Sequence, residues 1–176
     1  MITVVGTGTG GAAPRIGAAD LVAGAARHLE AAELPAGARR LLLGPLAPAL
    51  DEIGAYAAAG RRVVVLASGD PGHFGIVRAL GERFGAAALD VRPSVPSVAA
   101  AFARVGLSWD DAVVVSAHGR SLRTAVNVCL AHRKAAVLTG PGAGPAELGA
   151  ALARAGARRE LVVASRLGSG TESVVT

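Results

Sequence analysis

Short apolar runs and longer amphipathic stretches alternate along the whole of this 176-residue chain. The short runs are rich in Val, Ile and Leu and predict strands at residues 2–5, 41–44, 63–68, 89–93, 112–119, 135–142, 160–168 and 172–176. The longer stretches have a helical period and predict helices at residues 19–34, 48–60, 73–85, 97–106, 121–133 and 145–156. Continuous apolar strands between amphipathic helices are typical of a mostly parallel sheet, so we expect an α/β fold.

The segment PSVPS interrupts this alternation, with prolines at positions 93 and 96. Proline removes a backbone donor and restricts the residue before it, so neither a helix nor a strand continues through the segment. A chain of this length is close to one ordinary domain or to two small lobes. We therefore predict two lobes, residues 1–93 and 98–176, joined by a hinge at residues 94–97.

The composition is 52% hydrophobic but only 3% aromatic, with 24 glycines, so the core is expected to consist of Ala, Val and Leu. Cys129 is the single cysteine, which excludes an internal disulfide, and we expect no metal site. It lies among apolar residues of a predicted helix and is expected in the core. The chain shows neither a signal peptide nor an apolar run of membrane-spanning length, so we expect no membrane partner and a cytoplasmic location.

The formal net charge is +5, and the arginines are scattered with almost no aromatic residues between them. Nucleic-acid sites need stacking platforms for bases, so this pattern favours an anionic small molecule over nucleic acid. The alternative is that these arginines only solvate the helix faces. His28 and His132 flank helical stretches without partners at ligand spacing and are interpreted as surface residues.

The first glycine cluster, GTGTGG, fits the pattern GxGxxG directly after a predicted strand. A dinucleotide-binding turn needs a helix that begins inside the glycine run, but Pro14 and Gly17 intervene. A strand-like segment around Leu21 and Val22 then follows too soon for a crossover helix. This spacing disfavours a dinucleotide site. The loop, with Gly8 at its centre, either lines a cleft or is a flexible connection.

The stretch VVVLASGDPGHFG places Asp70 at the carboxyl end of a buried strand, where ligands bind in open α/β sheets. Asp70 would either cap a helix that begins near His73 or contact such a ligand. The flanking Gly69 and Gly75 are expected to let a ligand approach the backbone.

Several blocks of the sequence resemble, in order, those of the tetrapyrrole methylases, the S-adenosylmethionine enzymes of sirohaem and cobalamin synthesis. LASGDPGHFG resembles their SGDPxxFG signature, and the other blocks are ITVVGTGTGG, PSVPSVAAAFARVGLSWDDAVVVSAHGR, AAVLTGPGAGPAELGAAL and LVVASRLGS. The resemblance runs almost from end to end. The segments ADLVAGAARHLE, Trp109 to Ala112 and Ser116 to Arg120 resemble more narrowly the precorrin C5-methyltransferase branch.

The resemblance implies two α/β lobes with a cleft between them for a folded S-adenosylmethionine, and a homodimer. The implied cofactor contacts are Gly69, Asp70 and His73 in the first lobe, Pro96 and Ser97 at the hinge, and His118, Thr139 and Gly140 in the second lobe. The branch often reads TD where this chain has Thr139-Gly140, so one polar contact is missing here. For a polycarboxylate tetrapyrrole substrate the candidates are Gly8, Arg15, Arg27, Arg120 and Arg123.

The activity that the resemblance implies is C5 methylation in cobalamin biosynthesis, from (cobalt-)precorrin-7 to (cobalt-)precorrin-8. Such methyl transfer needs alignment more than a strong base, so we assign no catalytic residue. Many relatives carry a second module for the C15 step, and this sequence stops at Thr176, so a separate C15-methyltransferase and decarboxylase is the expected partner. Two alternatives remain: a nucleotide-binding oxidoreductase and a non-catalytic partner subunit with the methylase fold.

Overall fold

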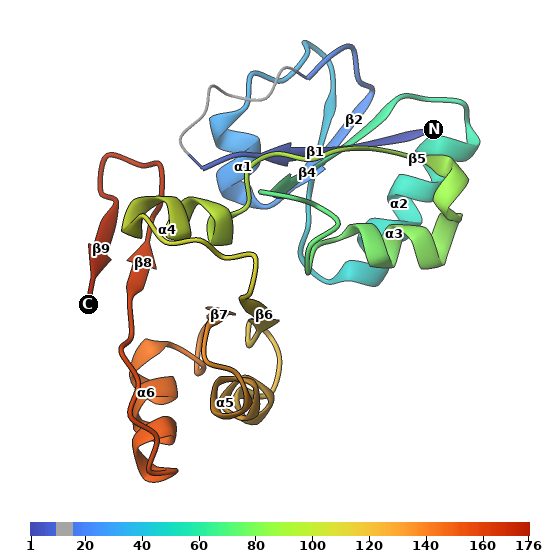
Figure 1. The fold of residues 1–176 in the computed structure, drawn as a ribbon. Helices are drawn as coiled ribbons and strands as arrows, with labels where there is room; N and C mark the ends of the chain where they lie inside the picture. The colour runs from blue at the N-terminus through green and yellow to red at the C-terminus, as the bar shows by residue number, and fades with distance from the viewer. Residues whose placement is uncertain (10–15) are drawn as a thin grey trace. The chain divides into compact units, whose positions relative to one another are not determined.

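The computed structural model describes residues 1–9 and 16–176 and divides into two compact units, Met1–Ser97 and Val98–Thr176. Figure 1 shows the course of the chain. Each unit is built of strands and helices that alternate along the sequence, as the apolar pattern predicts.

A parallel sheet forms the centre of the first unit. Its strands are β1 (Ile2–Thr7), β2 (Leu21–Gly24), β3 (Arg39–Leu42), β4 (Val63–Ser68) and β5 (Leu89–Arg92). They lie in the order β3-β2-β4-β1-β5, and each strand runs parallel to its neighbours. The carboxyl ends of all these strands therefore meet at one edge of the sheet.

Helices cover both faces of this sheet (Figure 1). On one face, Ile53 of α2 (Leu46–Ala58) and Leu80 of α3 (Val77–Phe84) pack against Ile2 and Val4. On the other face, Leu29 of α1 (Ala26–Ala31) packs with side chains of β2 and β4. A short 3₁₀ helix, η1 (Ala86–Ala88), leads into β5. Successive strand residues point to opposite faces, and both faces of the central strands β2 and β4 are buried, so these two strands are almost continuously apolar.

The prediction of a continuous helix over residues 19–34 is wrong, whereas the strand-like segment expected around Leu21 and Val22 is confirmed. Residues Leu21–Gly24 form β2, which is buried on both faces between β3 and β4, and α1 follows only at Ala26. The burial available to a central strand outweighs the helical propensity of this Ala-rich stretch. The helix expected from residue 73 also begins later, at Val77, because the preceding residues form turns.

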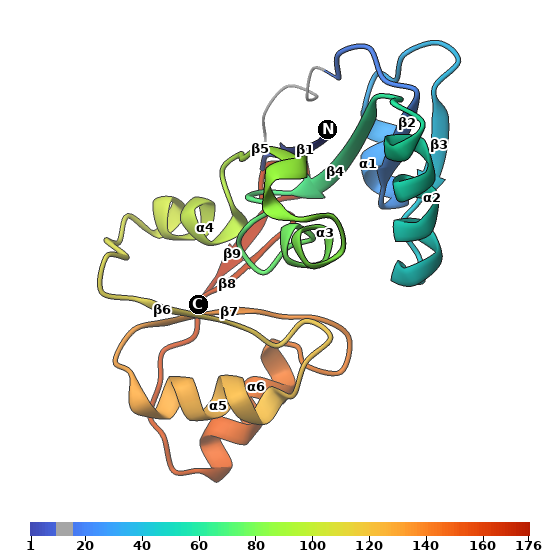
Figure 2. The same ribbon diagram turned by 90° about the vertical axis from the view of Figure 1, so that its right-hand side faces the viewer.

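The second unit contains α4 (Ser97–Val105), β6 (Val113–Ser116), α5 (Leu122–Ala131), β7 (Ala135–Leu138) and α6 (Pro145–Arg154). Strands β6 and β7 are parallel, and α5 and α6 lie side by side (Figure 2). Cys129 packs with Leu148 and Leu152 between these helices, which confirms its expected place in the core. Burial raises the pKa of the Cys129 thiol, opposed by the charge of Arg159.

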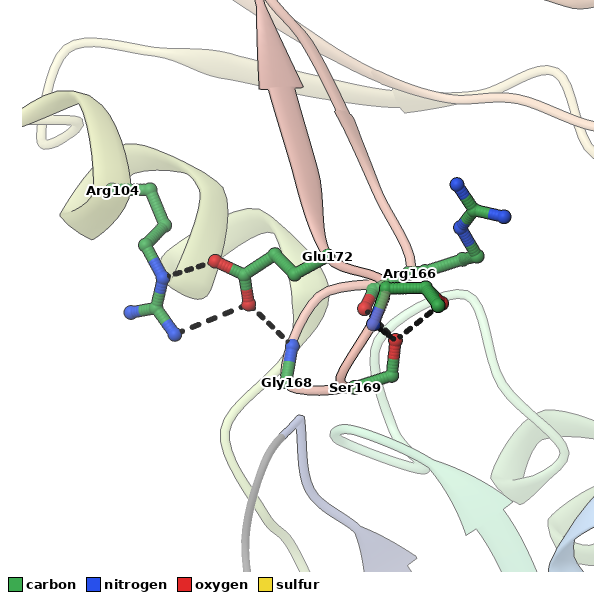
Figure 3. A network of polar contacts seen from close by, with 6 residues as sticks. Arg104, Arg166, Gly168, Ser169 and Glu172 are labelled. Carbon is green, nitrogen blue, oxygen red and sulfur yellow. Dashed lines mark hydrogen bonds and ion pairs between the residues drawn. The ribbon is translucent and has the colours of Figure 1, made fainter.

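The chain ends in the antiparallel strands β8 (Val163–Ser165) and β9 (Ser173–Val175), which differ from the parallel pairing of the other strands. Glu172 holds the turn between them. Its carboxylate accepts hydrogen bonds from Arg104 Nε of α4 at 2.5 Å and from the backbone N of Gly168 at 2.6 Å (Figure 3). These two donors lower the pKa of the Glu172 carboxyl. The contact is therefore present above the ordinary pKa of glutamate and is lost as the pH falls through the lowered value.

Within residues 1–9 and 16–176, none of the helices has the length and apolar character needed to cross a membrane.

Candidate functional site

The carboxyl ends of β1 and β4 lie next to each other in the sheet of the first unit, with Thr7 paired to Ser68. From β1 the chain continues to β2, beyond β4, whereas from β4 it continues to β5, beyond β1. Neighbouring strands whose connections leave in opposite directions form a switch point, and ligands of open α/β sheets bind in the crevice there. Gly8 and Thr9, which follow β1, and the Gly69-Asp70 turn, which follows β4, are both at this point.

Gly6 lets the segments after β4 and β5 meet beside the end of β1. The backbone N of Gly69 donates to Thr7 O at 2.8 Å, and the backbone N of Ser94 donates to Gly69 O at 3.2 Å. A Cβ on Gly6 would lie 2.1 Å from Gly69 O and 2.6 Å from Ser94 N. The first glycine of GTGTGG is therefore required by packing between backbone segments of the protein itself.

Gly69 contacts the predicted hinge directly. Its φ is +57°, in the left-handed region, and a Cβ at this position would lie 2.8 Å from Pro96 Cα. A Cβ on Gly75 would lie 2.3 Å from Pro71 O. Protein backbone occupies the Cβ direction of Gly69 and of Gly75, so packing explains glycine at both positions, and the approach of a ligand to their backbone stays a prediction.

Asp70 organises the turn after β4. Its Oδ1 accepts a hydrogen bond from the backbone N of Gly72 at 2.8 Å, and the backbone N of His73 donates to Asp70 O at 3.1 Å. Since α3 begins only at Val77, the interpretation of Asp70 as a helix cap is wrong. Among the described residues, Asp70 has no ion pair, and its Oδ2 accepts no hydrogen bond from protein. One carboxylate oxygen is thus left to accept from a cationic ligand.

His73 follows in the same turn and is half-buried, with its ring centroid 4.8 Å from that of Phe74. Phe74 itself has a φ of +55°, which is uncommon for a residue with a side chain. Ser97 is exposed at the first position of α4. The structure therefore brings Gly69, Asp70, His73 and Pro96 together at the carboxyl edge of the sheet, with Ser97 next in sequence to Pro96.

Arg27, a predicted substrate contact, forms a polar cluster at this edge with His28 and Ser68, whose part in it sequence reasoning missed. Arg27 Nη2 donates to Ser68 Oγ at 2.9 Å, Arg27 Nε donates to His28 Nε2 at 3.3 Å, and His28 Nε2 lies 3.0 Å from Ser68 Oγ. His28 is half-buried, so its interpretation as a surface residue is wrong, whereas His132 is exposed as expected. The pairing of β2 with β4 brings α1 to Ser68, and no local pattern in the sequence indicates that pairing.

The environment of His28 favours its neutral form. Burial is the main cause that lowers the pKa of this imidazole, and the neighbouring Arg27 charge adds to it. The nearby backbone of Leu66 acts in the opposite direction on this pKa, although the buried Nδ1 of His28 has no hydrogen-bond partner within the described residues. Gly24 allows this approach, because a Cβ there would lie 3.2 Å from Leu66 Cβ and 3.5 Å from His28 Cβ.

The second unit brings His118 and Gly140 together at the neighbouring carboxyl ends of β6 and β7. The backbone N of Ala117 donates to Leu138 O at 2.8 Å, just before these residues. A Cβ on Gly140 would lie 2.6 Å from His118 Nδ1, and Thr139 beside it is exposed. The His118 ring therefore occupies the space that the aspartate of the TD pattern would need, which gives a physical reason for glycine here.

The structure shows fewer contacts for the remaining candidate substrate residues. Arg120 lies in the turn after His118, and Arg123 is exposed in the first turn of α5. A Cβ on Gly8 would lie 2.5 Å from Ser94 Oγ. Arg15 lies outside the described residues. In the described part of the chain, no group of His, Cys, Asp and Glu side chains is arranged to hold a metal ion.

Residues 1–176 match the family described as Tetrapyrrole (Corrin/Porphyrin) Methylases, and the chain belongs to this family. It is 35% identical over 184 aligned positions to the cobalt-precorrin-7 C(5)-methyltransferase of Salmonella typhimurium, with 99% of this chain and 89% of that protein covered. It is 37% identical over 135 residues to the decarboxylating precorrin-6Y C(5,15)-methyltransferase of Sinorhizobium sp, with 76% of this chain covered. The chain matches only 32% of that second relative's length.

Solved structures show the same fold. The precorrin-6Y methylase of Archaeoglobus fulgidus superposes with a TM-score of 0.70 at 25% identity, covering 99% of this chain and 88% of that one. The uroporphyrin-III C-methyl transferase of Thermus thermophilus, solved with S-adenosyl homocysteine, gives 0.68 at 22% identity, with 99% and 86% covered. The predictions of the family, of the α/β fold class and of an S-adenosylmethionine-dependent tetrapyrrole methyltransferase are confirmed.

Proposed function

We propose that this chain methylates C5 of (cobalt-)precorrin-7 in cobalamin biosynthesis, with S-adenosylmethionine as the methyl donor. The observation that carries the proposal is the alignment of 99% of the chain with 89% of a cobalt-precorrin-7 C(5)-methyltransferase.

The residues at the carboxyl edge of the first unit fit one end of the donor. The amino-acid part of S-adenosylmethionine carries an ammonium group, and Asp70 has a carboxylate oxygen without a protein partner among the described residues. Pro96 and Gly69 pack together and fix the Asp70 turn beside the hydroxyl-bearing Ser97. We therefore assign Gly69, Asp70, His73, Pro96 and Ser97 to the donor, and add His118, Thr139 and Gly140 from the second unit.

The proposed mechanism depends on alignment. S-adenosylmethionine supplies a methyl group already activated by its sulfonium charge, and the reduced tetrapyrrole carbon is already nucleophilic. The protein must bind both molecules in reactive orientation and exclude water, and orientation of this kind supplies about 7 to 11 kcal/mol of the barrier. Asp70 would orient the donor, and Arg27, Arg120 and Arg123, together with Gly8 and Arg15 of the glycine loop, would orient the carboxylates of the substrate.

Equilibrium binding of S-adenosylmethionine and of NAD distinguishes this function from both alternatives. A methyltransferase is expected to bind S-adenosylmethionine and not NAD. Binding of NAD alone would favour the oxidoreductase, and binding of neither would favour a non-catalytic subunit that keeps only the fold.

We also expect a homodimer. The chain exposes large apolar side chains for its size, among them Leu42, Leu46, Leu107 and Trp109, and a two-fold interface would bury such surface. Light scattering at micromolar concentration should give twice the chain mass, and a monomer mass would contradict the expectation. We further propose that a separate enzyme performs the C15 step and that this chain is cytoplasmic.

A further inference from the structure

We propose that Arg27 binds one carboxylate group of the substrate, and that His28 and Ser68 are positioning residues that fix its guanidinium for this contact. These three residues are called the carboxylate clamp. The inference rests on the proposed function, because a tetrapyrrole with several carboxylate side chains is the ligand that the function supplies.

Hydrogen bonds hold the Arg27 guanidinium in place, but among the described residues no carboxylate neutralises its charge. Its two hydrogen-bond partners, Ser68 Oγ and His28 Nε2, are both uncharged acceptors, and within the described residues it forms no ion pair with an Asp or a Glu. Arg39, by contrast, pairs with Glu52 at 2.7 Å. A guanidinium has five N–H donors, and these contacts use one on Nε and one on Nη2. The donors left on Nη1 and Nη2 form the planar pair that binds a carboxylate through two hydrogen bonds.

The contacts of His28 also define its protonation state. Arg27 Nε only donates, so His28 Nε2 is its unprotonated acceptor, and the proton of the neutral ring is on Nδ1, a buried atom without a hydrogen-bond partner among the described residues. Ser68 Oγ accepts from Arg27 Nη2 and lies 3.0 Å from His28 Nε2, whose single lone pair is shared between the Arg27 Nε–H and the Ser68 hydroxyl. A charged His28 ring would carry protons on both nitrogens, and the one on Nε2 would face the Arg27 guanidinium. The arrangement therefore requires the neutral ring. The lowered pKa of His28 agrees with this arrangement.

The clamp is next to the proposed donor site in the sequence and in the sheet. Ser68 is the last residue of β4 and precedes Gly69 and Asp70, and α1 follows β2, the strand paired with β4. Arg27 is exposed, whereas His28 is half-buried, so the charged end of the clamp is accessible and its support is fixed. A carboxylate bound by Arg27 would anchor the substrate at the same sheet edge as Asp70.

The test is a comparison of KM and kcat for (cobalt-)precorrin-7. Arg27→Leu should raise KM roughly tenfold or more, the effect of losing a charge-assisted hydrogen-bonded pair, with kcat and S-adenosylmethionine affinity nearly unchanged. His28→Leu and Ser68→Ala should raise KM less, by about threefold to tenfold, because they loosen Arg27 without removing it. His28→Gln should recover most of the loss, since its amide oxygen accepts where Nε2 does.

Arg40→Leu and His132→Leu, at exposed positions of β3 and after α5, are the matched controls and should leave KM unchanged.

An unchanged KM in Arg27→Leu would overturn the clamp, as would an equal increase in Arg40→Leu, which would indicate a general effect of charge. An equal loss of S-adenosylmethionine affinity would move Arg27 to the donor site and would also overturn it. NMR of the His28 ring nitrogens should show the Nδ1–H form, and a proton on Nε2 would contradict the positioning role.

Failure of the proposed function is distinguishable from failure of the clamp. If the wild-type chain binds S-adenosylmethionine but does not methylate (cobalt-)precorrin-7, the substrate assignment fails. The clamp is then judged with uroporphyrin III, a porphyrin with many carboxylate groups, through its own fluorescence. Wild type and Arg40→Leu should bind it about tenfold more tightly than Arg27→Leu. Equal binding by all three chains, or no binding by the wild type, would overturn the clamp.

Discussion

Gly6→Ala is expected to lower the free energy of unfolding by about 3 kcal/mol, the upper end of the usual cost of overpacking a core. The new Cβ would lie 2.1 Å from Gly69 O and 2.6 Å from Ser94 N, and both contacts are with backbone, which has little freedom to move. The hydrogen bond from Ser94 N to Gly69 O, now 3.2 Å long, would have to break or shift. Urea denaturation followed by circular dichroism measures the loss.

Gly17→Ala is the control for this change. Gly17 belongs to the same glycine-rich segment, but a Cβ there meets nothing within 4 Å. Its unfolding free energy is expected to stay within about 0.5 kcal/mol of the wild type, as for most surface substitutions. Equal stability of the two variants would contradict the close approach of the β4 and β5 turns beside β1.

Asp70→Ala and Asp70→Asn are both expected to weaken S-adenosylmethionine binding at least tenfold, about 1.4 kcal/mol. The physical reason is the loss of the carboxylate charge that would face the ammonium group of the donor. The two variants differ in the turn, because asparagine retains an oxygen that accepts from Gly72 N, as Asp70 Oδ1 does at 2.8 Å. Asp70→Asn should therefore be the more stable of the two. Isothermal titration calorimetry measures the affinity and thermal unfolding the stability.

Asp51→Ala serves as the matched loss of a carboxylate in the same unit. Asp51 is exposed and pairs with Arg83 at 3.0 Å, and exposed pairs of this kind contribute little. Its S-adenosylmethionine affinity should equal that of the wild type. Wild-type affinity in Asp70→Asn would reduce Asp70 to a turn residue and remove it from the donor site.

The apolar pattern of the sequence was sufficient to predict most strands and helices in their order, because these elements depend mainly on local periodicity. It was insufficient where burial decided the structure. Residues 21–24 form a strand inside an Ala-rich stretch that looks helical, since β2 is enclosed between β3 and β4. The position of Asp70 at the end of β4 was also predictable, because a turn of Gly, Asp and Pro follows an apolar run.

The side-chain contacts of the site were not predictable from local sequence. His28 and Ser68 are 40 residues apart and meet only because β2 pairs with β4. The glycines were identified as important for a ligand, but the sequence did not show that packing against protein backbone also requires glycine at Gly69 and Gly75. At Gly140 the sequence showed only a departure from the family pattern, and the contact with His118 supplies its cause.

Mass spectrometry of the product tests the central claim most directly. The chain is incubated with (cobalt-)precorrin-7 and S-adenosylmethionine carrying a ¹³C-labelled methyl group, and NMR then locates the label. The proposed function predicts a gain of one methyl group, at C5, with no loss of carbon dioxide. A product that has lost carbon dioxide, or that carries the label at another carbon, would contradict the claim, as would an unchanged tetrapyrrole in the presence of folded protein that binds the donor.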